Sequence, residues 1–467
     1  MLAGCAVPIQ VKQDPSVSAD WHQRGYRPEV ASVIAIPGLR TWWRTWNDLQ
    51  LNALVEEALD QNLDLAQSQL RLSQQRVLAH TAYATYLPNI SAESRTLQEV
   101  AAIDSYVHAR IHMSWDLGLF GNSQSLQRAA DASVLHARAQ LQVSRVALAA
   151  QVVRCYLEIQ LAQYQRTLYE RIATLDAEAL RLLLVRQAQR IDSKRAVERQ
   201  RLRINATASQ LAKVIESQAR AAHDLAVLLG QTQPKPEWLQ AYTVMRMPQP
   251  TAPTLIALSA DMIRARPDLQ SAEASVELAA AQVGIAQAAL YPRLMLSGSL
   301  LYSYNITQRR KVTSYLLPIL GAQIDIPMLD WGRRRTLLDV NGLVLESSIR
   351  AYQQSVVHGI SNVDASLVAL QTQGLRLEGL AKSQEVLKQQ ARIQSVRQRH
   401  GLNSTLDTIQ AERAVLQSRS DIGAARAALL LAYVALYKAL CGAPPDSLQR
   451  KSTADTRHTD ISGERYP

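Results

Sequence analysis

Few residues in this chain have the types and spacing needed for chemistry. His108 and His112 lie four residues apart in a segment of alternating polarity, so both project from one face of a strand. No third ligand accompanies them, and histidines on the polar face of a lumen or an interface are the favoured interpretation. The sequence has no glycine-rich phosphate loop, no H-E-x-x-H and no G-x-S-x-G motif. It therefore predicts no enzyme, no metal site and no cofactor.

The three cysteines, Cys5, Cys155 and Cys441, form neither a disulfide framework nor a metal pattern. Cys155 lies on an apolar stripe and is expected to be a small packed core residue, and Cys441 is expected to be structural as well. Cys5 follows Leu2-Ala3-Gly4, which resembles a bacterial lipobox, whose cysteine becomes the acylated first residue of the mature protein. A full signal has an apolar stretch of about 7 to 15 residues before the cysteine. The lipid-anchor prediction therefore requires a start internal to the true reading frame, or a truncated signal.

The net charge is +11, and eight cations lie between Arg181 and Arg203. A solvated helical face, a tip that docks a partner and a nucleic-acid surface are the three interpretations of this cluster. Nucleic-acid binding would require interleaved aromatic residues or a known module, and neither is present. The sequence therefore predicts no nucleic-acid partner, and a solvated face is the favoured interpretation.

The elements that would position these residues occur twice. Two proline-free blocks of equal length, 122–229 and 333–440, are each bounded by Gly-containing landmarks. Four landmarks recur in the same order in both halves: Leu65 and Leu269, Pro88 and Pro292, Gly121 and Gly332, Gly230 and Gly442. The first two pairs are offset by 204 residues, and the last two by 211 and 212. This regular recurrence indicates an internal duplication.

Each proline-free block is too long for one helix, since about 108 residues would extend about 160 Å. We expect a fold-back at 187–193 in the first copy and at 399–404 in the second, giving helices of about 65 and about 38 residues. One lead-in helix, 48–87 or 252–291, precedes each hairpin. Apolar residues recur every seven positions along two stripes of the long helix, and the first stripe consists of Leu161, Leu168, Leu175 and Leu182. Two stripes predict a helix packed on two faces, as in a wall of helices.

The segments between the helices alternate in polarity with period two, which predicts strands. Each hairpin has room for two strands of about ten residues, the length that crosses a bilayer when tilted. Four strands cannot close a membrane barrel, because the smallest have about eight, so membrane-spanning strands would require an oligomer. No run of about 18 apolar residues occurs, so we expect no transmembrane helix.

Several ordered motifs carry a family resemblance. They are Trp42-Trp43-Arg44-Thr45-Trp46-Asn47-Asp48-Leu49, Asn62-Leu63-Asp64-Leu65, Arg264-Ala265-Arg266-Pro267-Asp268-Leu269, Leu290-Tyr291-Pro292, Asp330-Trp331-Gly332 and Arg399-His400-Gly401-Leu402-Asn403-Ser404-Thr405-Leu406-Asp407. Together they resemble the TolC-like outer-membrane efflux proteins, particularly the lipoprotein branch, over residues 38 to 443. The first-half turn, 187–191, departs from the family pattern because it lacks the usual glycine.

This resemblance implies a mainly α fold with a small β part, in which duplicated halves form a long α-helical barrel and a transmembrane β-barrel completed by trimerisation. It implies a passive exit duct for small molecules, with a periplasmic adaptor protein and an inner-membrane pump as partners. The duct is expected in the outer membrane, anchored in its lipid through Cys5 and extending into the periplasm. The alternative is a coiled-coil scaffold without a pore.

The turn motif, by the same resemblance, assigns Leu406, Asp407, Gln410 and Asn403 to the constriction at the periplasmic end. A carboxylate repeated by threefold symmetry would attract cations, and Leu406 could add an apolar collar. Asp407 could equally be a helix-start residue favoured by the helix dipole, and the sequence leaves both interpretations open.

The expected segments follow from the landmarks. They are 1–47 lipobox and linker, 48–88 first helix, 89–118 first hairpin, 119–230 first long helix pair, 231–251 linker, 252–292 second helix, 293–329 second hairpin, 330–442 second long helix pair and 443–467 disordered tail.

Overall fold

The computed structural model describes residues 39–98, 104–242, 247–248, 266–312 and 317–440. They divide into two compact units, which are described separately. The sheet unit contains the described parts of 68–141 and 268–356, and the helical unit contains the remaining described residues. Cys5, Cys441, residues 252–265 and the expected tail lie outside the described residues.

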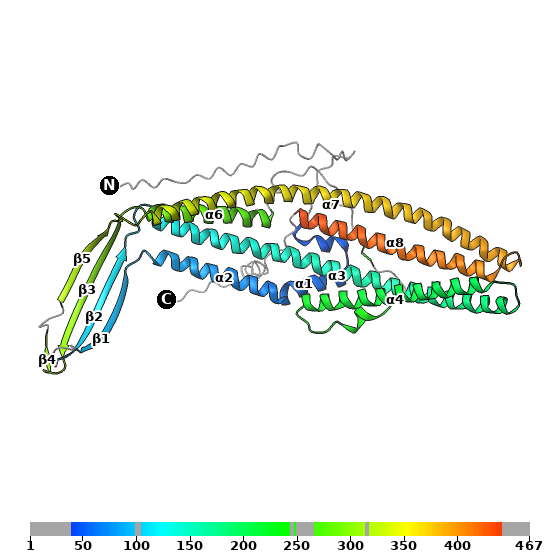
Figure 1. Cartoon of the computed structure of the whole chain (residues 1–467), viewed down its shortest axis with the longest axis horizontal. Coiled ribbons are helices and arrows are strands. Elements are labelled where there is room, and N and C mark those ends of the chain that lie inside the picture. The colour runs from blue at the N-terminus through cyan, green and yellow to red at the C-terminus, as the bar shows by residue number, and fades with distance from the viewer. Residues whose placement is uncertain (1–38, 99–103, 243–246, 249–265, 313–316, 441–467) are drawn as a thin grey trace, which may run out of the picture. The chain divides into compact units, whose positions relative to one another are not determined.

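The elements repeat in the same order in the two halves (Figure 1). Both long helices contain 67 residues and both return helices contain 35, and the two pairs of helices have the same offset between the halves. The repeated elements of the first half are α2 (Leu63–Ala84), β1 (Asn89–Gln98), β2 (Ser105–Asp116), α3 (Asn122–Ala188) and α4 (Lys194–Leu228). The second consists of α6 (Pro267–Ala288), β3 (Arg293–Asn305), β5 (Leu317–Asp325), α7 (Arg333–Arg399) and α8 (Thr405–Ala439), with the short β4 (Arg310–Lys311) between β3 and β5.

The first lead-in segment is broken, where the sequence predicted one helix over 48–87. The chain forms α1 (Leu49–Gln61) and then α2, because Asn62 between them adopts an extended conformation. The Asn62 side chain accepts a hydrogen bond from the Leu65 N–H at 2.9 Å and so caps the new helix. No Gly or Pro marks this break.

A capping contact closes each half of the helical unit. Asn62 donates a hydrogen bond from Nδ2 to the carbonyl of Leu228, the last residue of α4, at 3.0 Å. Arg266, at the equivalent position of the second half, donates from Nη1 to the carbonyl of Ala439, the last residue of α8, at 2.7 Å. Carbonyls at a helix C-terminus have no partner within the helix, and a donor there satisfies them. The Arg-Pro-Asp motif thus joins the start of one helix to the end of another.

The tryptophans of the first motif are buried in the helical unit, on η2 (Leu39–Trp46). Trp42 stacks on Tyr437 of α8 with ring centroids 5.0 Å apart and planes 9° from parallel. Asp48 caps α1 through the N–H groups of Gln50 and Leu51, and its second oxygen accepts a hydrogen bond from the Tyr156 hydroxyl at 2.7 Å. This motif therefore attaches the segment before α1 to the long helices.

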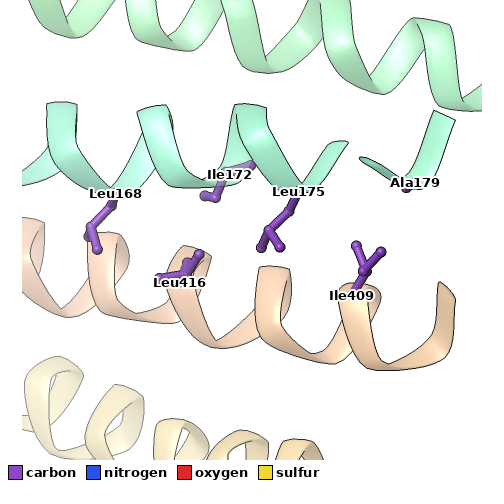
Figure 2. Close-up of a cluster of buried hydrophobic side chains, with 6 residues drawn as sticks. All are labelled: Leu168, Ile172, Leu175, Ala179, Ile409 and Leu416. Atoms are coloured by element: carbon purple, nitrogen blue, oxygen red, sulfur yellow. The ribbon is translucent and has the colours of Figure 1, made fainter. Parts of the chain in front are cut away.

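The long helices of the helical unit pack through apolar side chains. Figure 2 shows α3 and α8 meeting through six buried residues: Leu168, Ile172, Leu175, Ala179, Ile409 and Leu416. Leu168 and Leu175 of the predicted stripe belong to this cluster, and Leu182 packs against its edge. A second cluster joins α7 to α8 through Val363, Leu436, Ala439 and Leu440.

By length and mean hydropathy, α8 is the one described helix that could cross a membrane. More than half of its most apolar stretch is buried within the protein, as expected of a helix in the core.

The sheet unit contains an antiparallel sheet in which the two halves pair directly. The order is β1-β2-β3, with β4 and β5 both pairing with β3. β2 of the first half lies beside β3 of the second, with Ile111 opposite Leu300. Outside the sheet, the Phe120 and Tyr291 rings stack with centroids 5.1 Å apart, so aromatic contacts also join the halves.

Candidate functional site

The candidate constriction lies at the α7–α8 turn of the helical unit. α7 ends at Arg399, and Gly401 adopts φ +70°. The Gly401 N–H donates to Gln398 O and the Leu402 N–H donates to Arg397 O, both at 2.9 Å. These two hydrogen bonds and the left-handed residue define a Schellman motif, which satisfies the last carbonyls of the helix.

The start of α8 positions the predicted residues. Ser404 caps the helix by accepting from the Leu406 N–H at 3.1 Å, and Asp407 accepts from the Ser404 N–H at 3.2 Å. Together they form a capping box. The Asp407 carboxylate therefore has a local structural role, while its side chain is exposed.

The structure divides the four predicted residues between different surroundings. Leu406 is half-buried and packs against the α3–α8 cluster. Asp407 and Gln410 are both exposed, and a spacing of three residues places them on one face of α8. Asn403 is half-buried in the turn and donates to Gln394 Oε1 on α7. Asp407 and Gln410 are thus brought together on a surface, and Leu406 lies against the neighbouring helix.

The α3–α4 turn has the same backbone geometry without a glycine. Arg190 adopts φ +59°, and its N–H donates to Gln187 O at 2.9 Å. The Ile191 N–H donates to Arg186 O, also at 2.9 Å. Ser193 occupies the cap position of α4 and makes no side-chain capping hydrogen bond. The departure predicted at 187–191 is therefore an arginine in the position that Gly401 occupies in the second half.

A buried carboxylate connects three helices near these turns. Asp176 of α3 is 1% exposed and accepts hydrogen bonds from Thr207 Oγ1 on α4 at 2.7 Å and from Arg413 Nε on α8 at 3.0 Å. Gln200 Nε2 on α4 adds hydrogen bonds to the carbonyl and the carboxylate of Asp176. A buried charge is tolerated only when it is paired and hydrogen-bonded, and these partners satisfy it. We refer to Asp176, Gln200, Thr207 and Arg413 as the Asp176 cluster.

The sequence interpretation missed the Asp176 cluster, although one signal was present. Asp176 directly follows Leu175 of the apolar stripe, so a carboxylate stands at the edge of a buried face. Gln200 and Thr207 are seven residues apart on the return helix and so share a face. Arg413 lies 237 residues from Asp176, and no local pattern links the two.

The remaining chemical candidates are His108, His112 and Cys155. His108 and His112 lie on the same face of β2, opposite Arg95 and Ser91 of β1. Among the described residues, no group of three or more His, Cys, Asp or Glu side chains could hold a metal ion. Cys155 is buried, and its burial raises the pKa of the thiol to about 11, so it is an unreactive neutral thiol at neutral pH.

The family model described as outer membrane efflux protein matches residues 54–231 and 258–442. This chain belongs to that family. As an outer membrane efflux protein it is a transport protein, and the two matched segments coincide with the two halves of the duplication.

Curated relatives of this outer membrane efflux protein match along nearly its whole length. Nodulation protein T of Rhizobium leguminosarum bv. trifolii is 26% identical over 443 residues, which is 91% of each chain. The cation efflux system protein CusC of Escherichia coli O157:H7 is 26% identical and covers 86% of this chain and 88% of its own.

Solved structures show the same fold. The outer-membrane channel OprN superposes with a TM-score of 0.73 at 26% identity and covers 89% of this chain and 98% of its own. The CmeC outer membrane channel of Campylobacter jejuni superposes with a TM-score of 0.78 over 94% of both chains, and at 18% identity this match shows the fold alone. The predicted class, mainly α with a small β part and TolC-like, is confirmed.

Proposed function

We propose that this outer membrane efflux protein is the exit duct of a tripartite efflux system. Three copies form a β-barrel in the outer membrane and an α-helical tunnel in the periplasm. A periplasmic adaptor protein and an inner-membrane pump deliver small molecules to it. The relatives named as outer-membrane efflux components and channels support this assignment.

The two faces of the sheet carry the strongest structural support. One face presents a group of exposed apolar side chains, which the register places on the same side: Ile90, Ile111, Leu300, Leu320 and Ile324. The opposite face of β1 and β2 bears Glu93, Arg95, His108, Arg110 and His112. An outward apolar face and an inward polar face are the pattern of a membrane barrel.

The edges of the sheet support a trimer. The four long strands contain 10, 12, 13 and 9 residues, close to the length that crosses a bilayer. Among the described residues, β1 and β5 each pair on one side only. Unpaired strand edges are not tolerated in lipid, and pairing β1 of one copy with β5 of the next would remove them.

The outer helices of the helical unit offer a second contact between copies. α4 contacts α3 through the Asp176 cluster, α3 packs on α8, and α8 packs on α7. α7 bears a regularly spaced stripe of exposed apolar residues: Val357, Val368, Leu375, Val386 and Ile393. Exposed apolar side chains that recur on one face of a helix favour a surface that another helix covers. We assign this α7 face to the α4 face of the neighbouring copy, where Leu202 and Val227 are exposed.

The constriction assignment remains part of this proposal. The shared exposed face of Asp407 and Gln410 supports it, since threefold symmetry would bring three such faces around one axis. Leu406 would contribute the collar from its position beside α3, and Asn403 would hold the turn against α7.

A lipid anchor at Cys5 completes the proposed localisation. Acyl chains contribute about 0.8 kcal/mol per buried CH₂, so an acylated Cys5 would attach the N-terminus to the outer membrane. Radioactive palmitate labelling of cells that express the full precursor tests this, with Cys5→Ser as the variant. Loss of label with retained outer-membrane insertion supports the anchor, and persistent label contradicts it.

Planar-bilayer recording tests the duct itself. Detergent-purified protein should form conducting channels, and native mass spectrometry should give three chains per particle. The alternative, a coiled-coil scaffold without a pore, predicts release from membranes by carbonate and no conductance. A stable monomer with ordered strands would contradict the trimer, because its sheet edges would face lipid.

A further inference from the structure

The polar face of the first hairpin carries more positive than negative charge. The register places five charged or titratable side chains on this face of β1 and β2: Glu93, Arg95, His108, Arg110 and His112. Glu93 is the one carboxylate among these five, and it pairs with Arg110 at 2.7 Å. Arg95, His108 and His112 make no ion pair with any described residue. The face therefore keeps the charge of one arginine and gains more when the histidines are protonated.

The pairing of Arg95 with His108 does not serve the stability of the sheet. The two residues lie directly opposite each other on β1 and β2. Like charges at such positions destabilise a sheet, and this pair becomes one of like charges once the histidine is protonated. Glu93 lies diagonal to His108, and Arg110 already binds its carboxylate. A position that breaks a local rule in this way is expected to have another role.

Hydroxyl groups lie beside the histidines on the neighbouring strands. On β3, Ser303 is opposite His108 and Ser299 is opposite His112, and on β1 Ser91 is opposite His112. None of the β3 residues beside the two histidines is charged. Hydroxyls and protonated imidazoles both donate hydrogen bonds, and a carboxylate or a phosphate accepts them. The surroundings of the histidines therefore match an anionic group.

The spacing of the two histidines excludes a metal ion shared between them. They lie four residues apart on a strand, which is about 13 Å at about 3.3 Å per residue, whereas zinc ligands lie about 2 Å from the ion. His108 stacks on Tyr106 of the same strand, with ring centroids 6.0 Å apart. Histidine changes its charge between about pH 5 and 8. The positive charge of this face therefore rises as the pH falls through that range.

We propose that Arg95, His108 and His112 of each copy line the barrel interior and select anions, and that the selection strengthens as the histidines are protonated. The inference rests on the proposed function, in which the polar face of the sheet is the inside of the barrel. It names the substrate class as small molecules that carry an anionic group such as a carboxylate or a phosphate. Cations that line a passage with low-dielectric walls raise the local concentration of anions and so favour their passage.

Reversal potentials in planar bilayers test this proposal. The detergent-purified full chain is inserted into neutral phosphatidylcholine, so that the lipid adds no surface charge, and is recorded under a KCl gradient at about pH 8 and about pH 5. The ratio of Cl⁻ to K⁺ permeability should rise at least about threefold on acidification, because both histidines of each copy gain a charge.

Two matched double variants locate the titrating groups. His108→Gln with His112→Gln should reduce the rise to less than about 1.3-fold. His223→Gln with His400→Gln removes two exposed histidines of the helical unit and should leave the rise unchanged. Both variants retain Asp407, so any titration at the proposed constriction is common to them.

Arg95→Gln separates the fixed charge from the titrating charge. Because arginine stays protonated throughout this range, the variant should lower the preference for Cl⁻ at both pH values and leave the rise on acidification in place. Arg199→Gln is the control, since it removes an exposed arginine of α4. This variant also tests the proposal if the histidine variant forms no channels.

Block by a multivalent anion gives a second measurement. Naphthalenetrisulfonate stays fully ionised over this pH range, so a change in its block reports the charge of the protein. Its half-blocking concentration should fall at least about fivefold between pH 8 and pH 5 for the original chain, and less than about twofold for the histidine variant at positions 108 and 112.

The other outcomes overturn the proposal. They are a permeability ratio that is equal at the two pH values, a rise that survives the loss of His108 and His112, and a rise that is lost with His223 and His400. Conductance separates this inference from the exit duct: channels whose selectivity does not depend on Arg95 and the histidines sink only the anion selection, whereas absence of channels from the original chain sinks the duct.

Discussion

The α3–α4 and α7–α8 turns make the same two Schellman hydrogen bonds, all at 2.9 Å, at equivalent positions of the two halves. They differ in the left-handed residue and in how the next helix is capped. The second turn has Gly401 in the left-handed conformation and a complete capping box at the start of α8. The first has Arg190 in that conformation, and the start of α4 has neither a side-chain cap nor an acidic residue in its first turn.

This difference separates backbone geometry from side-chain chemistry. The backbone of the turn is retained in both halves, so it is a requirement of the fold. Local rules of helix capping are obeyed in the second turn and broken in the first. Positions where a sequence breaks local rules while keeping the geometry are those where another role is expected.

The largest expected effect comes from the Asp176 cluster, which links the α3–α4 pair to α8. Asp176→Ala would leave half-buried Arg413 and the buried Thr207 hydroxyl without their carboxylate acceptor. We expect it to lower the free energy of unfolding by about 2 to 3 kcal/mol, because hydrogen bonds to a charged group contribute about 1.5 to 3 kcal/mol. Denaturant unfolding followed by circular dichroism measures this, with exposed Glu178→Ala as the matched control. A loss no larger than that of the control would show that the cluster does not hold the helices together.

Exchanging the left-handed residues should move the stability of the two turns in opposite directions. Gly401→Ala should lower the free energy of unfolding by about 1 to 2 kcal/mol. The added Cβ would have no neighbouring atom within 4 Å, so the cost comes only from the backbone strain at φ +70°. Arg190→Gly should stabilise by only about 0.5 kcal/mol, because glycine also raises the entropy of the unfolded chain. The same unfolding measurement gives both values, and a destabilising Arg190→Gly would mean that Arg190 supports its own turn.

The caps should respond unequally to the same substitution. Ser404→Ala removes a capping hydrogen bond and should cost about 1 kcal/mol. Ser193→Ala removes no such bond and should change stability by less than about 0.3 kcal/mol. Equal costs in thermal unfolding would indicate that the two helix starts are equivalent in solution.

A stability change of no more than about 0.5 kcal/mol is expected for Asp407→Asn, which removes charge but keeps an oxygen acceptor for the Ser404 N–H. If a ring of three Asp407 carboxylates lines the constriction, the variant should reduce cation selectivity and block by multivalent cations in planar bilayers. Ser404→Ala is the control, since it weakens the cap and keeps the carboxylate. Wild-type selectivity in Asp407→Asn would leave the carboxylate with its capping role alone.

Local signals made much of the architecture predictable. Gly and Pro landmarks revealed the duplication, and the fold-back expected at 187–193 coincides with the end of α3 at Ala188 and the start of α4 at Lys194. Helix lengths expected as about 65 and about 38 residues are 67 and 35. Period-two alternation likewise predicted the hairpins. All of these features could be predicted because each depends on residues that are close together in the sequence.

Features that depend on distant partners could not be predicted in the same way. The break at Asn62 was missed because no Gly or Pro marks it, and the contact that fixes the Asn62 side chain to the carbonyl of Leu228 spans 166 residues. The left-handed conformation of Arg190 was missed because sequence rules reserve it for glycine. The family resemblance assigned Asp407 to the constriction. Its part in the capping box with Ser404 follows only from the hydrogen bonds of the structure.

The capping contacts of Asn62 and Arg266 also bear on the order of folding. Each closes a loop within its own half, over 166 and 173 residues. During synthesis the first loop is complete once Leu228 has emerged, before any of the second half exists. The Asp176–Arg413 pair spans 237 residues and must wait for α8. Until then the carboxylate of Asp176 has only its first-half partners on α4, Gln200 and Thr207. Its pairing with Arg413 marks a step at which two separately closed halves become one molecule.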